Sequence, residues 1–171
     1  GPGDTSRLPA AYSDTKTPAH PARCAGDAAR FLEQDAADWS IVNDGGEASV
    51  WFGGAATATR SGQFHASGAN GTIGTGPCQV IGAWVADRKP VLWFTGDGSF
   101  GFYAMEMETM ARLGIPVVCV ISNNSSWGMI HMAEKYVRPQ EIEEKGPCNV
   151  ALHPMRAYEK MTEMWGGYGE K

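Results

Sequence analysis

The architecture of the chain is set by one short segment, Val91-Leu92-Trp93-Phe94-Thr95-Gly96-Asp97-Gly98-Ser99. Its first four residues are all apolar, which is typical of a strand buried on both faces in a parallel sheet. Glycines then end the strand, residues 100–113 can form a helix capped by Gly114, and residues 116–122 predict a second apolar strand. The segment therefore predicts a strand-helix-strand unit and an α/β fold whose central parallel sheet is flanked by helices.

Further elements are expected on the N-terminal side of this unit. Apolar residues recur at helical spacing from His20 to about Ala37, and again from Val80 to Val85. Residues 40–42 are expected to add a short strand. Residues 50–70 show no sustained period and are interpreted as loops with a small helix.

The two ends of the chain carry weaker signals. Residues 138–153 are interpreted as a long loop and residues 155–165 as a last helix. Residues 1–18 cannot bury enough apolar surface to fold alone, and are expected to be a tag remnant, with Gly1-Pro2 as a cleavage scar, followed by a linker. Residues 19–171 are expected to form one domain, because the chain of 171 residues is too short for two ordinary ones.

The charge balance limits the class of partner. Lys plus Arg number 14 against 19 Asp plus Glu, and the formal net charge of -5 argues against nucleic acid or an anionic membrane. No apolar run approaches the roughly 18 residues of a membrane-spanning helix. The four cysteines are widely separated, without a Cys-x-x-Cys pair or the spacing of a zinc site. A reduced, cytoplasmic protein is expected.

Residues 96–101 match the Gly-x-Gly-x-x-Gly pattern of dinucleotide-binding turns. Two features argue against that interpretation. The negative charge of Asp97 would face the pyrophosphate that such a turn holds, and the next strand is followed by Asn123-Asn124 rather than by an acidic residue for the ribose.

A divalent cation removes this conflict. A parallel crossover brings the carboxyl ends of both strands to one edge of the sheet, about 5 Å apart if the strands pair directly, so Asp97 and Asn124 become neighbours. Carboxylate and amide oxygens suit magnesium, which commonly completes its shell with phosphate oxygens and water. Residues 71–129 contain only three basic side chains, none of them in a glycine turn: Arg88, Lys89 and Arg112. The expected ligand is therefore a magnesium diphosphate.

The Gly96-Asp97-Gly98 motif, followed after a spacer by Asn123-Asn124, resembles that of the thiamine diphosphate enzymes of the acetolactate synthase, benzoylformate decarboxylase, oxalyl-CoA decarboxylase and 2-hydroxyacyl-CoA lyase group. The resemblance runs from about His20 to Lys171 and covers what looks like their C-terminal, diphosphate-binding domain. It implies thiamine diphosphate and Mg²⁺ as cofactors.

The resemblance also implies roles for individual residues. Magnesium would be held by Asp97, the Asn124 side chain and the Ser126 carbonyl. The segment Gly71-Thr72-Ile73-Gly74 resembles the one beneath the bent cofactor, with Ile73 between the two rings, although these glycines also suit a simple tight turn. The other implied cofactor-binding residues are Gly96, Gly98, Ser99, Gly128 and Met129.

Glu47 is the candidate catalytic residue. The turn Asp44-Gly45-Gly46-Glu47 aligns with the loop near the thiazolium ring, where relatives carry neutral residues such as Gln or Asn. A carboxylate there could serve as an acid or base, and the alternative is a surface glutamate. His65 and His131 are further acid-base candidates, with hydrogen-bonded structural histidines as the alternative.

The resemblance leaves part of the enzyme unaccounted for. Relatives use an activating glutamate from the N-terminal domain of a neighbouring subunit, and they usually add a helix and a strand beyond the position of Lys171. The chain is therefore expected to be a fragment or one chain of a split, oligomeric enzyme that needs a partner chain or domain carrying that glutamate.

The expected activity is a carbon-carbon lyase that cleaves 2-hydroxyacyl-CoA to formyl-CoA and an aldehyde or ketone. Residues 148–171 look closest to the 2-hydroxyacyl-CoA lyase and oxalyl-CoA decarboxylase branch. Two alternatives stand beside it. One is a 2-keto acid decarboxylase or acetolactate synthase-like enzyme, and the other is a cofactor-binding subunit without turnover.

Overall fold

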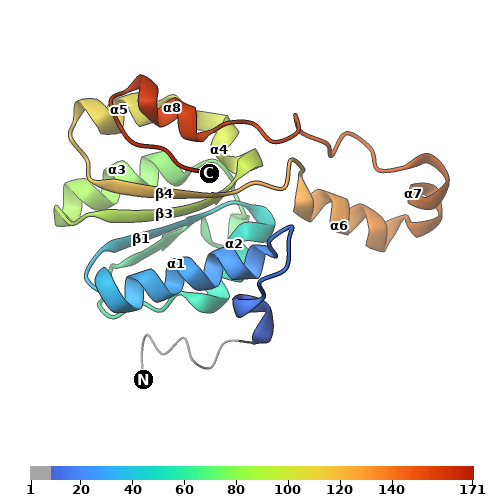
Figure 1. The fold of residues 1–171 in the computed structure, drawn as a ribbon, viewed down its shortest axis with the longest axis horizontal. Helices are drawn as coiled ribbons and strands as arrows, with labels where there is room; N and C mark the ends of the chain where they lie inside the picture. Colours follow the sequence, from blue (N-terminus) through green and yellow to red (C-terminus); the bar gives the residue numbers. More distant parts are fainter. Residues whose placement is uncertain (1–8) are drawn as a thin grey trace.

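A four-stranded parallel sheet forms the centre of the computed structural model, which describes residues 9–171 (Figure 1). The strand order is β2-β1-β3-β4, and every neighbouring pair is parallel. The strands are β1 (Ser40–Asp44), β2 (Phe64–Ala66), β3 (Val91–Gly96) and β4 (Val117–Ser122). The expected α/β fold with a central parallel sheet is confirmed.

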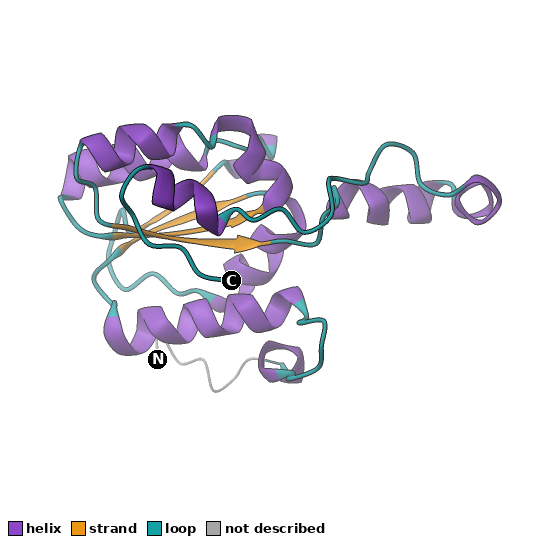
Figure 2. Ribbon diagram, turned by 45° about the horizontal axis from the view of Figure 1, so that its top comes forward, coloured by secondary structure: helices purple, strands orange, loops and turns teal. Residues whose placement is uncertain are grey.

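Helices cover both faces of the sheet (Figure 2). One face carries α1 (Pro21–Asp35) and α2 (Gly46–Ala55). The other carries α3 (Gly76–Asp87), α4 (Asp97–Tyr103), α5 (Glu106–Arg112) and α8 (Glu159–Met164). Side chains of β3 alternate between the two layers, so Leu92 and Phe94 join the first core while Val91 and Trp93 join the second. The apolar segment that predicted a strand buried on both faces is such a strand.

The crossover from β3 to β4 places the two strand ends together. Gly96 is the register partner of Ser122, so the residues that follow each strand emerge at the same edge of the sheet. The connection differs from the single helix expected over residues 100–113. Helix α4 begins inside the glycine turn at Asp97, and α5 follows it as a separate helix.

Two other regions contain more regular structure than the sequence predicts. The segment 50–70, interpreted as loops with a small helix, also contains the three-residue strand β2 and the 3-10 turn η3 (Gly68–Asn70). The expected long loop over residues 138–153 contains α7 (Pro139–Lys145). Proline suits the first position of a helix, where its missing N–H is not needed. The last helix, α8, is shorter than expected.

Helix α6 (Gly128–Val137) and α7 form an arm that projects away from the sheet (Figures 1 and 2). Neither helix contains a buried residue. The base of the arm is nevertheless fixed. The N–H of Trp127 donates to the carbonyl of Val150 at 2.8 Å, and the N–H of Leu152 donates to the carbonyl of Ser125 at 2.8 Å. These bonds hold the start of α6 at the end of β4.

The N-terminal segment contributes to the core. Residues 10–13 form the 3-10 helix η2 (Ala10–Ser13), and Tyr12 packs with α1 and α2 at 6% exposure. Its hydroxyl donates to the carbonyl of Trp51 at 3.1 Å. Tyr12 therefore belongs to the folded unit although it lies within the expected linker. The expected tag remnant at Gly1-Pro2 lies outside the described residues.

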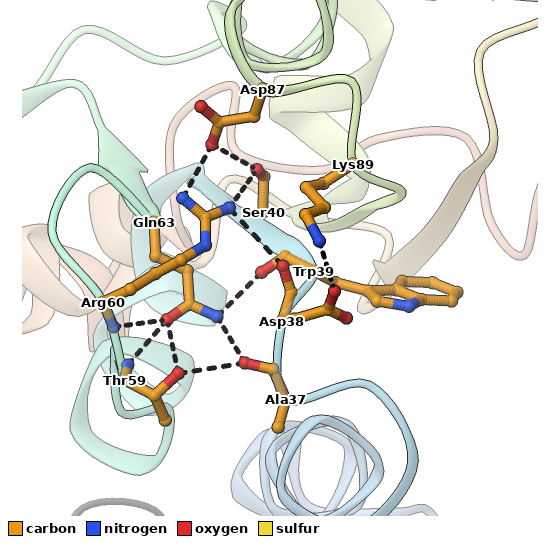
Figure 3. A network of polar contacts seen from close by, with 9 residues as sticks. All are labelled: Ala37, Asp38, Trp39, Ser40, Thr59, Arg60, Gln63, Asp87 and Lys89. Atoms are coloured by element: carbon orange, nitrogen blue, oxygen red, sulfur yellow. Dashed lines mark hydrogen bonds and ion pairs between the residues drawn. The ribbon is translucent and has the colours of Figure 1, made fainter.

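A polar network ties together the loops at the amino-terminal edge of the sheet (Figure 3). Gln63, 1% exposed, accepts from the N–H of Thr59 at 2.6 Å and donates to the carbonyls of Ala37 at 2.9 Å and Trp39 at 2.8 Å. The Arg60 guanidinium forms an ion pair with Asp87 at 2.7 Å. Because this edge is closed by structural contacts, the opposite, carboxyl edge is the one left open for a ligand.

Within residues 9–171, no helix has the combination of length and apolar character that crossing a bilayer requires.

Candidate functional site

A cavity of about 290 Å³ opens at the carboxyl edge of the sheet. Its walls come from the loops that follow β1, β3 and β4, together with the glycine loop before α3. Most of the residues predicted for the site line it: Glu47, Gly71, Ile73, Gly96, Asp97, Gly98, Ser99, Asn124, Ser126, Gly128 and Met129. The fold thus brings together four segments that are far apart in the sequence.

Four of the candidate residues do not line the cavity. Thr72 and Gly74 are not among the lining residues, and the Gly74 N–H instead donates to Asp44. His65 belongs to β2 and His131 to α6, and neither lines the cavity. The structure therefore does not bring a histidine to this site from the described part of the chain.

Asp97 lines the cavity. The residue is 4% exposed, and its Oδ2 accepts no hydrogen bond. Burial raises the pKa of this carboxyl, while the backbone N–H groups of Gly98, Ser125 and Ser126 act to lower it. A buried carboxylate oxygen without a partner is costly, and a bound cation would satisfy it.

The Asn124 amide oxygen and the Asp97 carboxylate share a neighbour, the Ser126 N–H. Asn124 Oδ1 accepts from the Ser126 N–H at 3.0 Å. The same N–H acts to lower the pKa of Asp97. The Ser126 carbonyl accepts from the Gly128 N–H at 2.9 Å and keeps a second lone pair. These are hard oxygen donors of the kind that magnesium prefers. No group of three or more His, Cys, Asp or Glu that could bind a metal exists in the described part, so a cation there depends on amide and backbone oxygens.

At two glycines of the cavity wall, an added Cβ would collide with a neighbouring side chain. A Cβ on Gly98 would lie 2.6 Å from the Trp127 ring. A Cβ on Gly128 would lie 2.5 Å from Glu47 Oε2 and 2.8 Å from Asn124 Nδ2. A side chain at either position would therefore displace Trp127, Glu47 or Asn124, so the packing of this part of the cavity wall requires glycine at both.

Asp44, at the end of β1, holds the glycine loop before α3 by two hydrogen bonds. The residue is fully buried, and its two carboxylate oxygens accept from the N–H groups of Gly74 and Gly76, each at 3.0 Å. Burial raises the pKa of Asp44, and the two backbone bonds oppose that rise. The sequence pattern marked residues 44–47 only for Glu47, so this anchoring function was missed. An acidic residue at the carboxyl end of a parallel strand was the available signal.

Glu47 is presented to the cavity from the first turn of α2. Its Oε2 accepts from the Asn124 amide nitrogen at 3.5 Å, the long end of the hydrogen-bond range. The carboxylate therefore lies in the cavity wall beside Asn124.

Several lining residues were not predicted from the sequence: Pro21, Gly46, Ala48, Ser122, Trp127 and Ile130. Trp127 packs edge-on against Phe102, with ring centroids 5.9 Å apart. Nothing in its local sequence separates it from the tryptophans of the core.

Comparison with known proteins agrees with this geometry. The family model described as "Thiamine pyrophosphate enzyme, C-terminal TPP binding domain" matches residues 44–168. A probable acetolactate synthase of Mycobacterium bovis is 34% identical over 158 residues, which cover 92% of this chain and 27% of that protein. A 2-hydroxyacyl-CoA lyase 2 of Caenorhabditis elegans is 38% identical over 146 residues, which cover 82% of this chain and 21% of that protein.

A shorter match is an oxalyl-CoA decarboxylase of Escherichia coli, 46% identical over 54 residues that cover 32% of this chain and 10% of that protein. The chain spans about a quarter of the length of the acetolactate synthase relative.

Proposed function

The chain belongs to the thiamine pyrophosphate enzymes, of which it contains the C-terminal TPP-binding domain, and we propose that it provides the magnesium- and diphosphate-binding half of a carbon-carbon lyase. The observation that carries this proposal is the buried, unpartnered Oδ2 of Asp97, in a cavity that Asn124 and Ser126 also line. Asp97 and Asn124 follow strands β3 and β4 at the carboxyl edge of the sheet, where the cavity is.

The cofactor would be held by residues already in place. Asp97, Asn124 and the Ser126 carbonyl are the proposed magnesium ligands. The diphosphate would contact Gly96, Gly98, Ser99, Gly128 and Met129. The first turn of a helix leaves backbone N–H groups without intrahelical partners, and α6 begins at Gly128 on the cavity wall. Ile73, with Gly71 and Thr72, would lie beneath the cofactor rings. Thiamine diphosphate, when bound, supplies an electron sink that stabilises a carbanion.

The proposed reaction is cleavage of a 2-hydroxyacyl-CoA. The 2-hydroxyl proton passes to Glu47, the C1–C2 bond breaks, and C2 leaves as the carbonyl carbon of an aldehyde or ketone. C1, the carbonyl carbon of the thioester, keeps its bond to sulfur and accepts a proton in place of C2, so that the second product is formyl-CoA. A base near the scissile bond is required at this step. Glu47 lines the cavity and is half-buried. Loss of carbon dioxide from a keto acid needs no such base.

A second candidate is synthesis of acetolactate from a keto acid. It is favoured by one observation, the wider match of the M. bovis protein, which covers 92% of this chain against 82% for the C. elegans lyase. A cofactor-binding subunit without turnover would share the same metal site and would differ only in showing no product.

We also propose that the catalytic unit includes a partner chain or domain carrying the activating glutamate, in an oligomeric enzyme. The chain spans only about a quarter of the length of that acetolactate synthase, which leaves most of the relative's sequence unmatched.

Product analysis distinguishes the candidates. The purified enzyme assembly is incubated with magnesium, thiamine diphosphate and, separately, a 2-hydroxyacyl-CoA or pyruvate. Formyl-CoA together with a carbonyl product is expected. Acetolactate or acetaldehyde from pyruvate, without cleavage of the thioester, would overturn the lyase assignment, and no product from either substrate would favour the subunit without turnover.

A further inference from the structure

The Asn124 amide has two different ends, and only its oxygen can bind a cation. Rotation of the amide by half a turn would exchange oxygen and nitrogen and remove a metal ligand. The residues on either side of the amide therefore decide whether the metal site is complete.

Two neighbours fix the orientation of this amide. On one side, the Ser126 N–H can only donate, and it meets Asn124 Oδ1 at 3.0 Å. On the other side, a carboxylate can only accept, and Glu47 Oε2 meets Asn124 Nδ2 at 3.5 Å. In the opposite orientation the amide nitrogen would face an N–H donor and the amide oxygen would face a carboxylate, so both contacts would be repulsive.

The space for this contact depends on Gly128. The absence of a side chain at Gly128 creates the space that Oε2 occupies, since a Cβ there would lie 2.5 Å from it. Glu47 itself is held in the first turn of α2, directly after β1. The Asn124 amide is thus contacted by Glu47, which follows β1, and by Ser126, which follows β4.

We infer that Glu47 is a positioning residue for the metal site: it holds the Asn124 amide with its oxygen toward the cation. This inference rests on the proposed magnesium site. A glutamine at position 47 could not do the same, because its own amide offers either a donor or an acceptor, which leaves only the Ser126 N–H to disfavour the flipped Asn124 amide. Such indirect contacts typically change metal affinity by about 10- to 100-fold.

A double-mutant cycle on magnesium affinity tests the inference without measuring turnover. Magnesium is titrated calorimetrically into the purified assembly at a fixed concentration of thiamine diphosphate. Glu47→Gln is expected to weaken magnesium binding about 10-fold. In an Asn124→Asp background the side chain has two oxygens and no orientation to fix, so Glu47→Gln should not weaken binding there.

Two comparisons separate orientation from the effect of charge alone. Glu143→Gln removes the same charge from the exposed arm helix α7 and should leave affinity unchanged. Glu47→Asp keeps the charge but withdraws it from Asn124, and should weaken binding as Glu47→Gln does. If Glu47→Asp binds magnesium like the parent, or Glu47→Gln weakens binding equally in both backgrounds, the positioning function is wrong.

The outcome also distinguishes this inference from the metal site on which it rests. If Asp97→Ala leaves magnesium affinity unchanged, the metal site itself is wrong. If Asp97→Ala abolishes binding while Glu47→Gln has no effect, only the positioning function fails. Thermal unfolding of each variant, recorded without cofactor, shows whether the protein is folded before the titration is interpreted.

Discussion

The buried carboxylate of Asp44, at the end of β1, accepts a hydrogen bond from the backbone N–H of Gly76 at 3.0 Å. Its second oxygen accepts from the N–H of Gly74, also at 3.0 Å. The Asp44 side chain therefore attaches the glycine loop before α3 to the end of β1. The position of Ile73 in the cavity wall depends on this attachment, because Ile73 directly precedes Gly74.

Replacing Asp44 with Asn tests the attachment. Asn offers one acceptor oxygen to two N–H donors and places its amide nitrogen against the other donor. The free energy of unfolding should fall by about 1–3 kcal/mol, the cost of a buried group left unsatisfied, as measured by urea denaturation. Asp35→Asn, at an exposed position in α1, is the control and should change little. An Asp44→Asn protein of parental stability would show that the two bonds contribute nothing net.

Asp97→Ala tests the metal site through ligand-linked stability. If the proposed site is correct, magnesium and thiamine diphosphate should raise the melting temperature of the parent, since ligand binding stabilises the folded form. The variant loses the buried carboxylate that the cation would satisfy, and the described cavity wall contains no Lys or Arg to replace it. No increase in melting temperature is expected for the variant, and an increase equal to that of the parent would contradict the magnesium assignment.

The sequence predicted the centre of the fold because its signals are local. The apolar run of β3, the glycine turn and the next apolar run determine the crossover, and a parallel crossover by itself brings Asp97 and Asn124 to one edge of the sheet. The sequence left open whether the two strands pair directly, and the structure shows that they do, with Gly96 opposite Ser122.

The parts that were missed depend on contacts between distant segments. Strand β2 has three residues, too few for a period, and its neighbourhood is fixed by Gln63 bonding to carbonyls of Ala37 and Trp39. The function of Asp44 depends on N–H groups about 30 residues away in the chain. Helix α7 was missed because Pro139 was interpreted as part of a loop, whereas it begins a helix.

Stability at acid pH should depend on the network at the amino-terminal edge. The Arg60 guanidinium, by hydrogen bonding to Asp87, holds the pKa of that carboxyl below its ordinary value. A carboxyl whose pKa is lower in the folded state contributes stability above its unfolded pKa, about 3.9, and loses that contribution as the pH falls through its folded pKa.

Asp87→Asn removes this pH-dependent contribution. The parent should be more stable than the variant at pH 7, and the difference should shrink as the pH falls below about 4. Urea denaturation at a series of pH values measures it. Asp35→Asn again serves as the control, and a difference between parent and Asp87→Asn that stays constant down to pH 2 would show that the ion pair is not the cause.

Gly98→Ala tests whether cofactor binding requires the absence of a side chain at position 98. The added methyl group would lie 2.6 Å from the Trp127 ring and must displace it. Tryptophan fluorescence should change and affinity for thiamine diphosphate should fall. Gly101→Ala in the same helix meets no atom within 4 Å and should preserve both, with a gain in stability of about 0.5–1 kcal/mol. Equal cofactor affinity in the two variants would show that Gly98 is not part of the cofactor site.

Glu47→Gln separates the proposed catalytic function of this residue from its contact with Asn124. As a general base for the 2-hydroxyl, Glu47 should contribute about 10²- to 10⁴-fold to the rate of cleavage. A positioning function alone would be overcome by excess magnesium, since saturation restores the bound cation. The experiment is therefore a measurement of kcat for 2-hydroxyacyl-CoA cleavage at increasing magnesium, with thiamine diphosphate saturating. If Glu47 is the base, the rate of the variant reaches a plateau far below that of the parent, because glutamine cannot accept the proton. If the variant reaches the parental plateau at high magnesium, Glu47 acts only through Asn124, and the base for the lyase reaction must come from the partner chain or domain.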